Sequence, residues 1–122
     1  MTLKDLQRLT QQGECTTLEF KKKANYPEKI VKELVAFANT EGGRLLLGVD
    51  DNGEPSGTRD IEGEAFILEK AIQELIRPKL NYSVEYIHLT DKKGIAIFKV
   101  EESLRKPHFV RENPKTRKGT AY

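Results

Sequence analysis

Three carboxylates lie where strands of a sheet are expected to begin or end, and a lysine lies beside them. Glu14 precedes the first expected strand, Glu19 lies on it, and Asp51 follows the second. Mg²⁺ and Mn²⁺ prefer carboxylate oxygens, and either metal can activate water and stabilise charge on a phosphodiester. Lys21, one strand period after Glu19, points to the same face and could meet the phosphate. These residue types predict a metal site that acts on a phosphodiester.

The spacing of the two glutamates sets a condition on this site. Glu14 and Glu19 are five positions apart, which is roughly 16 Å in an extended chain and places them on opposite faces of a strand. They can share a metal only if the chain bends at residues 15–17. The alternative is structural: Glu14 ends a helix, Glu19 pairs with lysines, and Asp51 serves a turn.

The hydrophobic pattern predicts the elements that position these residues. Apolar residues recur at helical spacing between Thr2 and Gly13, before Gly42, and from about Glu64 to Arg77. Strand patterns cover residues 18–21, 44–49, 82–89 and 95–100, the last two joined as a hairpin. Two strands that flank one helix form a right-handed βαβ crossover. We therefore expect an α+β fold in the order α-βαβ-α-ββ, a two-layer sandwich of a mixed four-stranded sheet with helices on one face.

The length and composition indicate one domain over residues 1–122. No apolar run approaches the roughly 20 residues of a membrane span, and the N-terminus has no signal-peptide pattern, so we expect a cytoplasmic protein without membrane contact. Cys15 is the only cysteine, which excludes an internal disulfide and a zinc site of paired cysteines. We expect this domain to be the N-terminal part of a longer protein, with a basic, flexible end at residues 111–122.

The net charge of +2 conceals an uneven distribution of basic residues. Residues 105–122 contain six basic side chains and one acidic side chain, and a second basic cluster lies at residues 21–23. Such asymmetry is typical of a protein with one phosphate-facing side, although a solvated loop would look the same. The candidate contacts to DNA or RNA are Lys21, Lys22, Lys23, Arg105, Lys106, Arg111, Lys115, Arg117 and Lys118.

No phosphate-binding loop supports a nucleotide site. The chain contains neither G-x-x-x-x-G-K-[ST] nor G-x-G-x-x-G. Gly42 and Gly43 follow a helix and precede a strand, the wrong order for such a loop, so they indicate a helix cap and a tight turn. Asn39 and Thr40 are expected to tie this turn together through nearby backbone. An ATP-binding or assembly module is therefore only an alternative.

Three blocks in this order resemble the signature of the Schlafen-type Alba-like domain, also known as Schlafen AlbA-2 or divergent AAA. The blocks are Glu14-x-x-x-x-Glu19-Phe20-Lys21, Ala36-Phe37-Ala38-Asn39-Thr40-Glu41-Gly42-Gly43 and Leu47-Gly48-Val49-Asp50-Asp51-Asn52-Gly53. Lys106-Pro107 and the final Ala121-Tyr122 are similar to the family's continuation into its last strand. The resemblance covers nearly the whole chain after Gly13.

The resemblance implies a nucleic-acid-binding function. Bacterial and archaeal members are typically N-terminal parts of longer proteins described as transcriptional regulators or divergent AAA-type ATP-binding proteins. In animal members, two such lobes form a clamp that cleaves structured RNA. The family's nuclease acids fall on Glu14, Glu19 and Asp51 by matching position. We therefore expect a nucleic-acid-binding domain of a transcriptional regulator, with DNA or RNA as its partner and a Mg²⁺- or Mn²⁺-dependent endoribonuclease as the alternative. A clamp built from this single lobe would require a homodimer.

Overall fold

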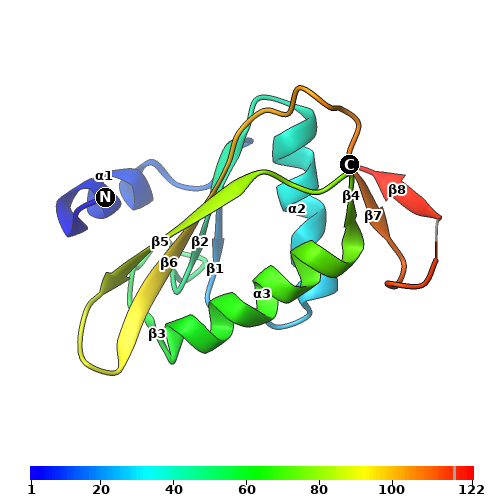
Figure 1. Cartoon of the computed structure of the whole chain (residues 1–122). Helices are drawn as coiled ribbons and strands as arrows, with labels where there is room; N and C mark the ends of the chain where they lie inside the picture. The colour runs from blue at the N-terminus through cyan, green and yellow to red at the C-terminus, as the bar shows by residue number, and fades with distance from the viewer. Residues whose placement is uncertain (117) are drawn as a thin grey trace.

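A parallel strand pair and an antiparallel hairpin form the main sheet of the computed structural model (Figure 1). The structure describes residues 1–116 and 118–122. Across the sheet the strands are β1 (Leu18–Lys21), β2 (Gly43–Leu47), β6 (Lys93–Val100) and β5 (Tyr82–His88). β1 and β2 are parallel, whereas the other two pairings are antiparallel. The short β3 (Thr58–Arg59) adds to the beginning of β6. The predicted two-layer α+β fold with a mixed sheet is confirmed.

The crossover from β1 to β2 is α2 (Pro27–Asn39), as the pattern predicts. Pro27 lies in the first turn, where its fixed φ favours a helix and its missing N–H leaves no unpaired donor. A continuous apolar stripe lines one side of the helix. The buried members of that stripe are Ile30, Val31, Leu34, Val35, Phe37 and Ala38. They pack on the same sheet face as Leu45 and Leu47 of β2, so burial fixes how β1 and β2 lie side by side.

The two long helices cover one face of the sheet, as expected for two layers, but the short first helix lies on the other face, which corrects the expectation that all helices share one face. α2 and α3 (Ile61–Leu75) share one core with Phe98 and Val100 of β6. The first helix, α1 (Leu3–Gln12), lies on the opposite side of the sheet (Figure 1). Its Leu6 is buried in a separate cluster formed by the alternate strand residues, including Phe20 and Ile97. Helical spacing predicted this helix but carries no information about which sheet face it covers.

The ends of α1 follow the sequence prediction closely. Thr2 Oγ1 accepts a hydrogen bond from the Asp5 backbone N–H at 3.1 Å, and the Asp5 carboxylate accepts one from the Thr2 N–H at 3.1 Å. This reciprocal pair is a capping box with Asp in place of Glu. None of the described residues forms a helix that is long and apolar enough to cross a membrane.

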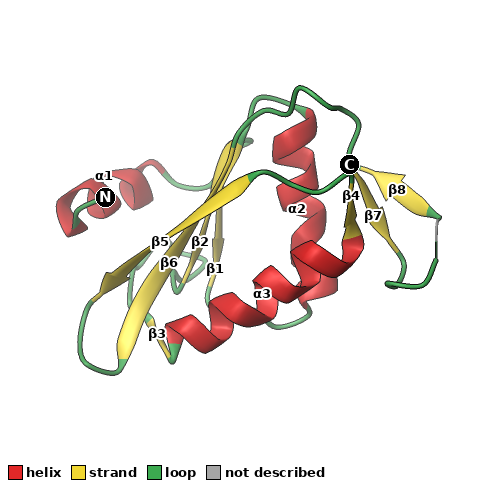
Figure 2. Ribbon diagram, in the orientation of Figure 1, coloured by secondary structure: helices red, strands yellow, loops and turns green. Residues whose placement is uncertain are grey.

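A second, smaller sheet lies beyond the C-terminal end of α3 (Figure 2), and only its last strand was indicated by the sequence. It contains β4 (Ile76–Arg77), β7 (Phe109–Arg111) and β8 (Gly119–Ala121), all antiparallel. Its inner face joins the main core through Ile76 and Val110, which are 0% and 7% exposed. Arg111 therefore lies on a paired strand, and Lys115 and Lys118 lie in the connection between β7 and β8.

The turn between α2 and β2 holds this smaller sheet in place. Asn39 Nδ2 donates to the backbone oxygens of His108 at 3.0 Å and Tyr122 at 2.7 Å, and Asn39 Oδ1 accepts from the His108 N–H at 2.8 Å. The expected local bonding is therefore wrong for Asn39, which binds distant backbone. It is correct for Thr40, whose hydroxyl donates to the Ala36 oxygen at 2.7 Å.

Candidate functional site

A tight turn brings Glu14 back alongside β1. Cys15 and Leu18 exchange two backbone hydrogen bonds, of 3.0 and 3.2 Å, so the chain reverses at Thr16 and Thr17. The Glu14 carboxylate then accepts the Phe20 N–H at 2.9 Å. The bend that the spacing of the two glutamates requires is therefore present, and one consequence is that Glu14 satisfies a backbone donor of the edge strand β1.

Glu14 and Glu19 form a hydrogen-bonded carboxyl pair with divergent pKa values. Partial burial raises the pKa of Glu19 to about 7, and its hydrogen bond to Glu14 adds to this effect. The same hydrogen bond lowers the pKa of Glu14, which the Phe20 N–H lowers further. Near neutral pH Glu19 is therefore present in both its protonated and its ionised form, while Glu14 is ionised.

Lys21 lies beside this pair but is engaged by acids. Its Nζ is 3.2 Å from Glu33 on α2 and 3.6 Å from Glu19. Burial lowers the pKa of Lys21, but the carboxylates of Glu33 and Glu19 outweigh this effect, so the net pKa is raised. Glu33 Oε2 is buried without a hydrogen-bond partner among the described residues. The cluster of Glu14, Glu19, Lys21 and Glu33 thus contains three acids and one lysine, so it keeps a net negative charge even when Glu19 is protonated.

Asp51 is not brought together with the two glutamates. It is exposed in the turn after β2. Its neighbour Asp50 is the engaged residue, with its carboxylate 3.5 Å from Lys22 Nζ and 3.2 Å from the Ser56 hydroxyl. Across residues 1–116 and 118–122, no three His, Cys, Asp or Glu side chains are grouped so that they could hold a metal ion. Glu14 and Glu19 therefore offer two neighbouring carboxylates, without Asp51 as a third ligand beside them.

The predicted basic contacts divide into engaged and available side chains. In the cluster at residues 21–23, Lys21 pairs with Glu33, and Lys22 donates to Ser56 and Gly57 besides pairing with Asp50. Lys23 is exposed and forms no ion pair with a described residue. In the cluster at residues 21–23, Lys23 is therefore the residue available to a ligand.

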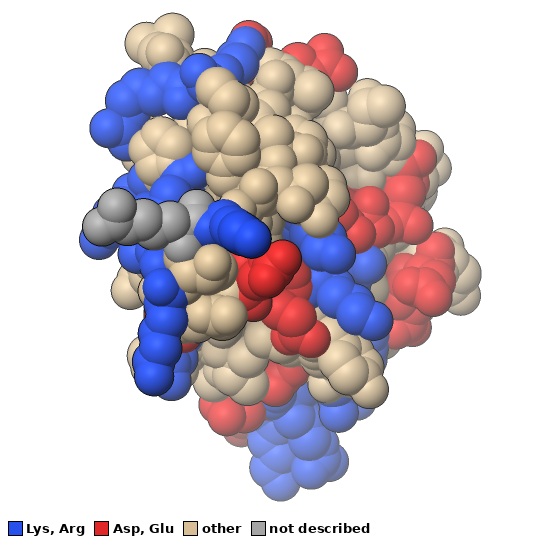
Figure 3. Space-filling view, turned by 90° about the vertical axis from the view of Figure 1, so that its right-hand side faces the viewer, with Lys and Arg blue, Asp and Glu red and all other residues tan. Residues whose placement is uncertain are grey.

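Most of the C-terminal basic residues have no acidic partner. Lys106 pairs with Glu102. Four others form no ion pair with any described residue, namely Arg105, Arg111, Lys115 and Lys118. We call these four the C-terminal basic surface. Arg117 lies outside the described residues. Figure 3 looks onto the side of the molecule that carries β8. Lys and Arg run along the left edge of this view and also lie at its centre right and bottom, and Asp and Glu lie mainly in its middle and on its right.

Two residues beside this surface were missed by the sequence reasoning. Arg77 was assigned to the end of a helix, and the structure places it on β4, paired with Phe109 of β7. Phe109 is 38% exposed, an unusual position for a large aromatic side chain. The alternation of Phe109, Val110 and Arg111 was the available signal, because a period of two places Phe109 and Arg111 on one face of a strand.

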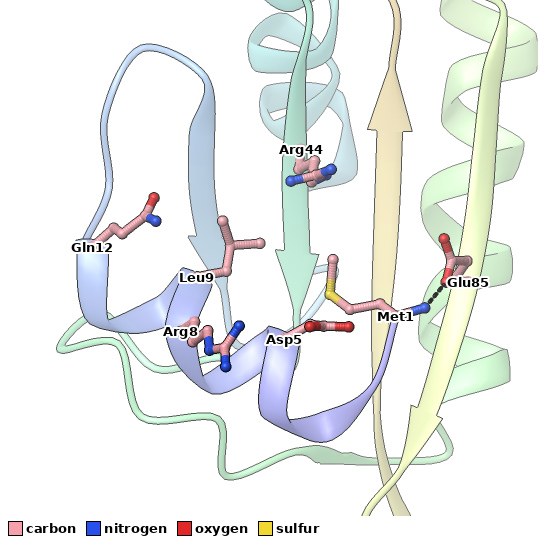
Figure 4. A pocket seen from close by; sticks show the side chains of 7 residues that line it. All are labelled: Met1, Asp5, Arg8, Leu9, Gln12, Arg44 and Glu85. Atoms are coloured by element: carbon pink, nitrogen blue, oxygen red, sulfur yellow. Dashed lines mark hydrogen bonds and ion pairs between the residues drawn. The ribbon is translucent and has the colours of Figure 1, made fainter.

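A hollow lies between α1 and the main sheet (Figure 4). It measures about 380 Å³ and mixes charges of both signs, from Asp5 and Arg8 on α1 to Arg44 on β2 and Glu85 on β5. The N-terminal ammonium of Met1 bridges it, 2.7 Å from Glu85 Oε2. Its charges are mostly balanced within the molecule, which makes it a weaker candidate for an anionic ligand.

Comparison with known proteins identifies the family of the chain and solved structures of similar fold. The family model described as "Schlafen, AlbA_2" matches residues 14–122. A solution NMR structure is similar over 100% of this chain and 90% of its own, with a TM-score of 0.71 and 21% identity. It is the N-terminal domain of a protein from Nitrosomonas europaea that is described as related to the ATP-dependent DNA helicase RecG. No curated protein matches the chain.

Proposed function

This chain belongs to the Schlafen AlbA_2 family, and we propose that it is a nucleic-acid-binding domain that contacts phosphates through its C-terminal basic surface. The observation that carries the proposal is the absence of acidic partners for Arg105, Arg111, Lys115 and Lys118 among the described residues. A cation without a carboxylate partner can pair with a phosphate and release counterions, which is the main source of affinity for nucleic acids.

The distribution of charge favours this surface over the cluster at residues 21–23. Lys21 and Lys22 would have to leave Glu33 and Asp50 before they could meet a phosphate. The members of the C-terminal basic surface lose no such partner on binding. The description of the similar structure as part of a helicase-related protein applies to that protein, and it agrees with a nucleic-acid partner for this fold.

Fluorescence anisotropy with labelled nucleic acids tests the proposal. Single-stranded and duplex DNA and RNA of one sequence are titrated with the chain at low and high salt. We expect binding at low salt that weakens steeply as salt rises. The double variant Lys115→Gln/Lys118→Gln should bind more weakly than the matched control Lys4→Gln/Lys92→Gln, which removes the same charge from exposed positions on α1 and the β5–β6 turn. No binding of any of the four nucleic acids at micromolar protein would refute the proposal.

Cleavage of RNA is the second candidate, and the observation that favours it is the contact between Glu14 and Glu19. A carboxyl with a pKa near 7 can exchange a proton at neutral pH, as acid–base chemistry requires. The metal-dependent form has less support because Asp51 stands apart from the pair. The test is incubation of a tRNA-like substrate with Mn²⁺ or Mg²⁺. Cleavage that is lost in both Glu19→Gln and Asp51→Asn supports the nuclease, whereas cleavage that persists in both points to a contaminant.

We also propose that the domain serves a regulatory protein and that two copies act together on nucleic acid. A homodimer would supply two lobes, as a clamp requires. Light scattering after size-exclusion chromatography, with and without bound DNA or RNA, measures the stoichiometry. Two chains per nucleic acid support the clamp, and a strict one-to-one complex contradicts it.

A further inference from the structure

The outward face of the small sheet combines one aromatic ring with two arginines. Cross-strand pairing places Arg77 opposite Phe109, Phe109 opposite Ala121, and Arg111 opposite Gly119. Partners in register, and residues two apart on one strand, share a face. Ile76 and Val110 occupy the other face and are buried in the core. The side chains of Arg77, Phe109 and Arg111 therefore project together from the outward face.

These three side chains and Gly119 line a hollow of about 450 Å³, a size found in small-molecule sites. Gly119 keeps the hollow open, because a Cβ there would lie 3.1 Å from the Cβ of Phe109 and 3.0 Å from the Val110 oxygen. Phe109 is 38% exposed, so its ring is both held by the sheet and reachable from outside.

Both arginines are oriented by backbone oxygens and keep their charge uncompensated. Arg77 donates to the oxygens of Gln73 and Ile76 at 2.8 and 2.7 Å. Arg111 donates through Nε to the Thr116 oxygen at 2.6 Å and through a terminal nitrogen to the Pro114 oxygen. Neither guanidinium forms an ion pair with a described residue. Two fixed positive charges on either side of an exposed ring suit a ligand with a flat apolar part and negative groups beside it.

We propose that this hollow binds an unstacked nucleobase of a single strand, with the base on Phe109 and the adjoining phosphates on Arg77 and Arg111. The inference rests on the proposed nucleic-acid-binding function and specifies its substrate. Bases within a duplex are stacked on each other and present no free face to a side chain, whereas a single strand can turn a base outward onto an aromatic platform. The hollow therefore selects single-stranded over duplex nucleic acid.

The test compares four ligands with one set of variants of the full chain. The ligands are single-stranded DNA, single-stranded RNA, the matching duplex, and a strand of the same length with abasic sites in place of bases. Phe109→Leu keeps the apolar character and removes the aromatic face. Phe109→Trp restores a ring. Phe66→Leu is the control, because Phe66 on α3 is 65% exposed and lies outside the hollow.

Phe109→Leu should weaken binding of the single strands roughly 5- to 100-fold, the range for loss of one stacked base. Its affinity for the duplex and the abasic strand should change less than about twofold. Phe109→Trp should restore binding, and Phe66→Leu should bind like the parent chain. Arg77→Gln should weaken binding of all strands, the abasic strand included, because it removes a phosphate contact.

Several results would overturn the inference while the proposed function stands. These are equal losses for single strand and abasic strand in Phe109→Leu, no loss in that variant, or a preference of the parent chain for duplex. Failure of the parent chain to bind any ligand would instead refute the proposed function. A single strand with 2-aminopurine gives a direct readout: its fluorescence should change on binding to the parent chain and much less on binding to Phe109→Leu. The single-stranded DNA and RNA arms decide which sugar is preferred.

Discussion

The carboxyl group of Glu19 is the clearest case of a side chain whose environment sets its chemistry. Its position on β1 buries it in part, Glu14 accepts a hydrogen bond from it, and Lys21 Nζ lies 3.6 Å from its carboxyl oxygen. Burial favours the neutral acid and the lysine favours the carboxylate, and the raised pKa shows that burial and the neighbouring acids outweigh the lysine. The folded chain therefore stabilises the protonated form of Glu19 more than the unfolded chain does.

This imbalance predicts that Glu19→Gln stabilises the protein at pH 8. Between the usual glutamate pKa and about 7 the folded chain holds more protons than the unfolded chain, so stability falls as pH rises through this window. Glutamine cannot ionise and can still donate to Glu14. We expect a gain of about 1 kcal/mol at pH 8, reduced from the full linkage value by partial exposure to water, and little change near pH 4.

Urea denaturation at pH 4 and pH 8 measures this effect. Asp91→Asn, in the exposed turn between β5 and β6, is the control for removal of one negative charge. An equal gain in both variants would show a general charge effect, and a loss of stability at pH 8 in Glu19→Gln would contradict the assigned protonation.

Among the connections between elements, the turn that joins α2 to β2 has strict steric demands. Gly42 has a φ of +83°, and a Cβ there would lie 2.8 Å from the Val100 oxygen. Glycine is therefore required at this position for two reasons: its backbone conformation and the close approach of the segment at the end of β6.

Gly42→Ala is expected to cost about 3 kcal/mol of stability, the sum of positive-φ strain and a backbone clash. Gly13→Ala is the matched control, because Gly13 has a similar φ of +80° with nothing within 4 Å of its added Cβ. That variant should cost only about 1 kcal/mol. Equal losses of melting temperature in the two variants would show that the clash does not contribute.

Asn39→Ala should loosen the attachment of the small sheet. It removes three hydrogen bonds to the backbone of His108 and Tyr122, at a cost of about 2 kcal/mol. Thr40→Ala, which removes only a local bond, should cost less than about 1 kcal/mol. Hydrogen exchange should accelerate at β7 and β8 in Asn39→Ala and not in Thr40→Ala. Unchanged exchange at β7 and β8 would refute the role of Asn39.

The elements that the sequence predicts are those with strong periodicity. The strands β2, β5 and β6 and the three helices carry patterns of five or more residues, and β1 carries a short alternation, so their positions follow from local sequence, whereas the two-residue β3 was not predicted. The small sheet carries no such pattern, because β4, β7 and β8 contain only two or three residues each. Such strands exist through pairing with distant segments, and pairing leaves no periodic signal.

The candidate site could likewise be predicted only in part from the sequence. The approach of Glu14 to Glu19 was conditional on a bend at residues 15–17, and that bend is present. The distance of Asp51 from the pair was not predictable, because strand order places it at the correct end of the sheet without fixing the direction of the turn. The hollow at Phe109 depends on cross-strand register, which a single sequence does not determine.

At the scale of the whole molecule, the uneven distribution of charge decides how a polyanion would approach. The four cations of the C-terminal basic surface lie on the segment that follows β6, whereas Glu19, Glu33 and Asp50 are paired with Lys21 and Lys22. If about four phosphates are contacted, the logarithm of the affinity for a single strand should fall with a slope of about −3 against the logarithm of salt concentration. This corresponds to a loss of roughly 50-fold between about 50 and 200 mM salt.

The double variant Lys115→Gln/Lys118→Gln should reduce this slope by about 1.4 and weaken binding at low salt. The slope is measured by anisotropy titrations at four or more salt concentrations. A slope near zero in the parent chain, or an unchanged slope in the variant, would show that these lysines do not contact phosphate.

The most direct test of the central claim is an NMR titration of the ¹⁵N-labelled chain with a short single strand. The largest amide shift changes should occur at Arg77, in β7 and in β8, with smaller changes along the rest of the C-terminal basic surface. The amide chemical shifts of α1 and of the hollow lined by Asp5, Arg8 and Arg44 should not change. Shift changes concentrated at α1, or none at a saturating concentration of the strand, would contradict the account.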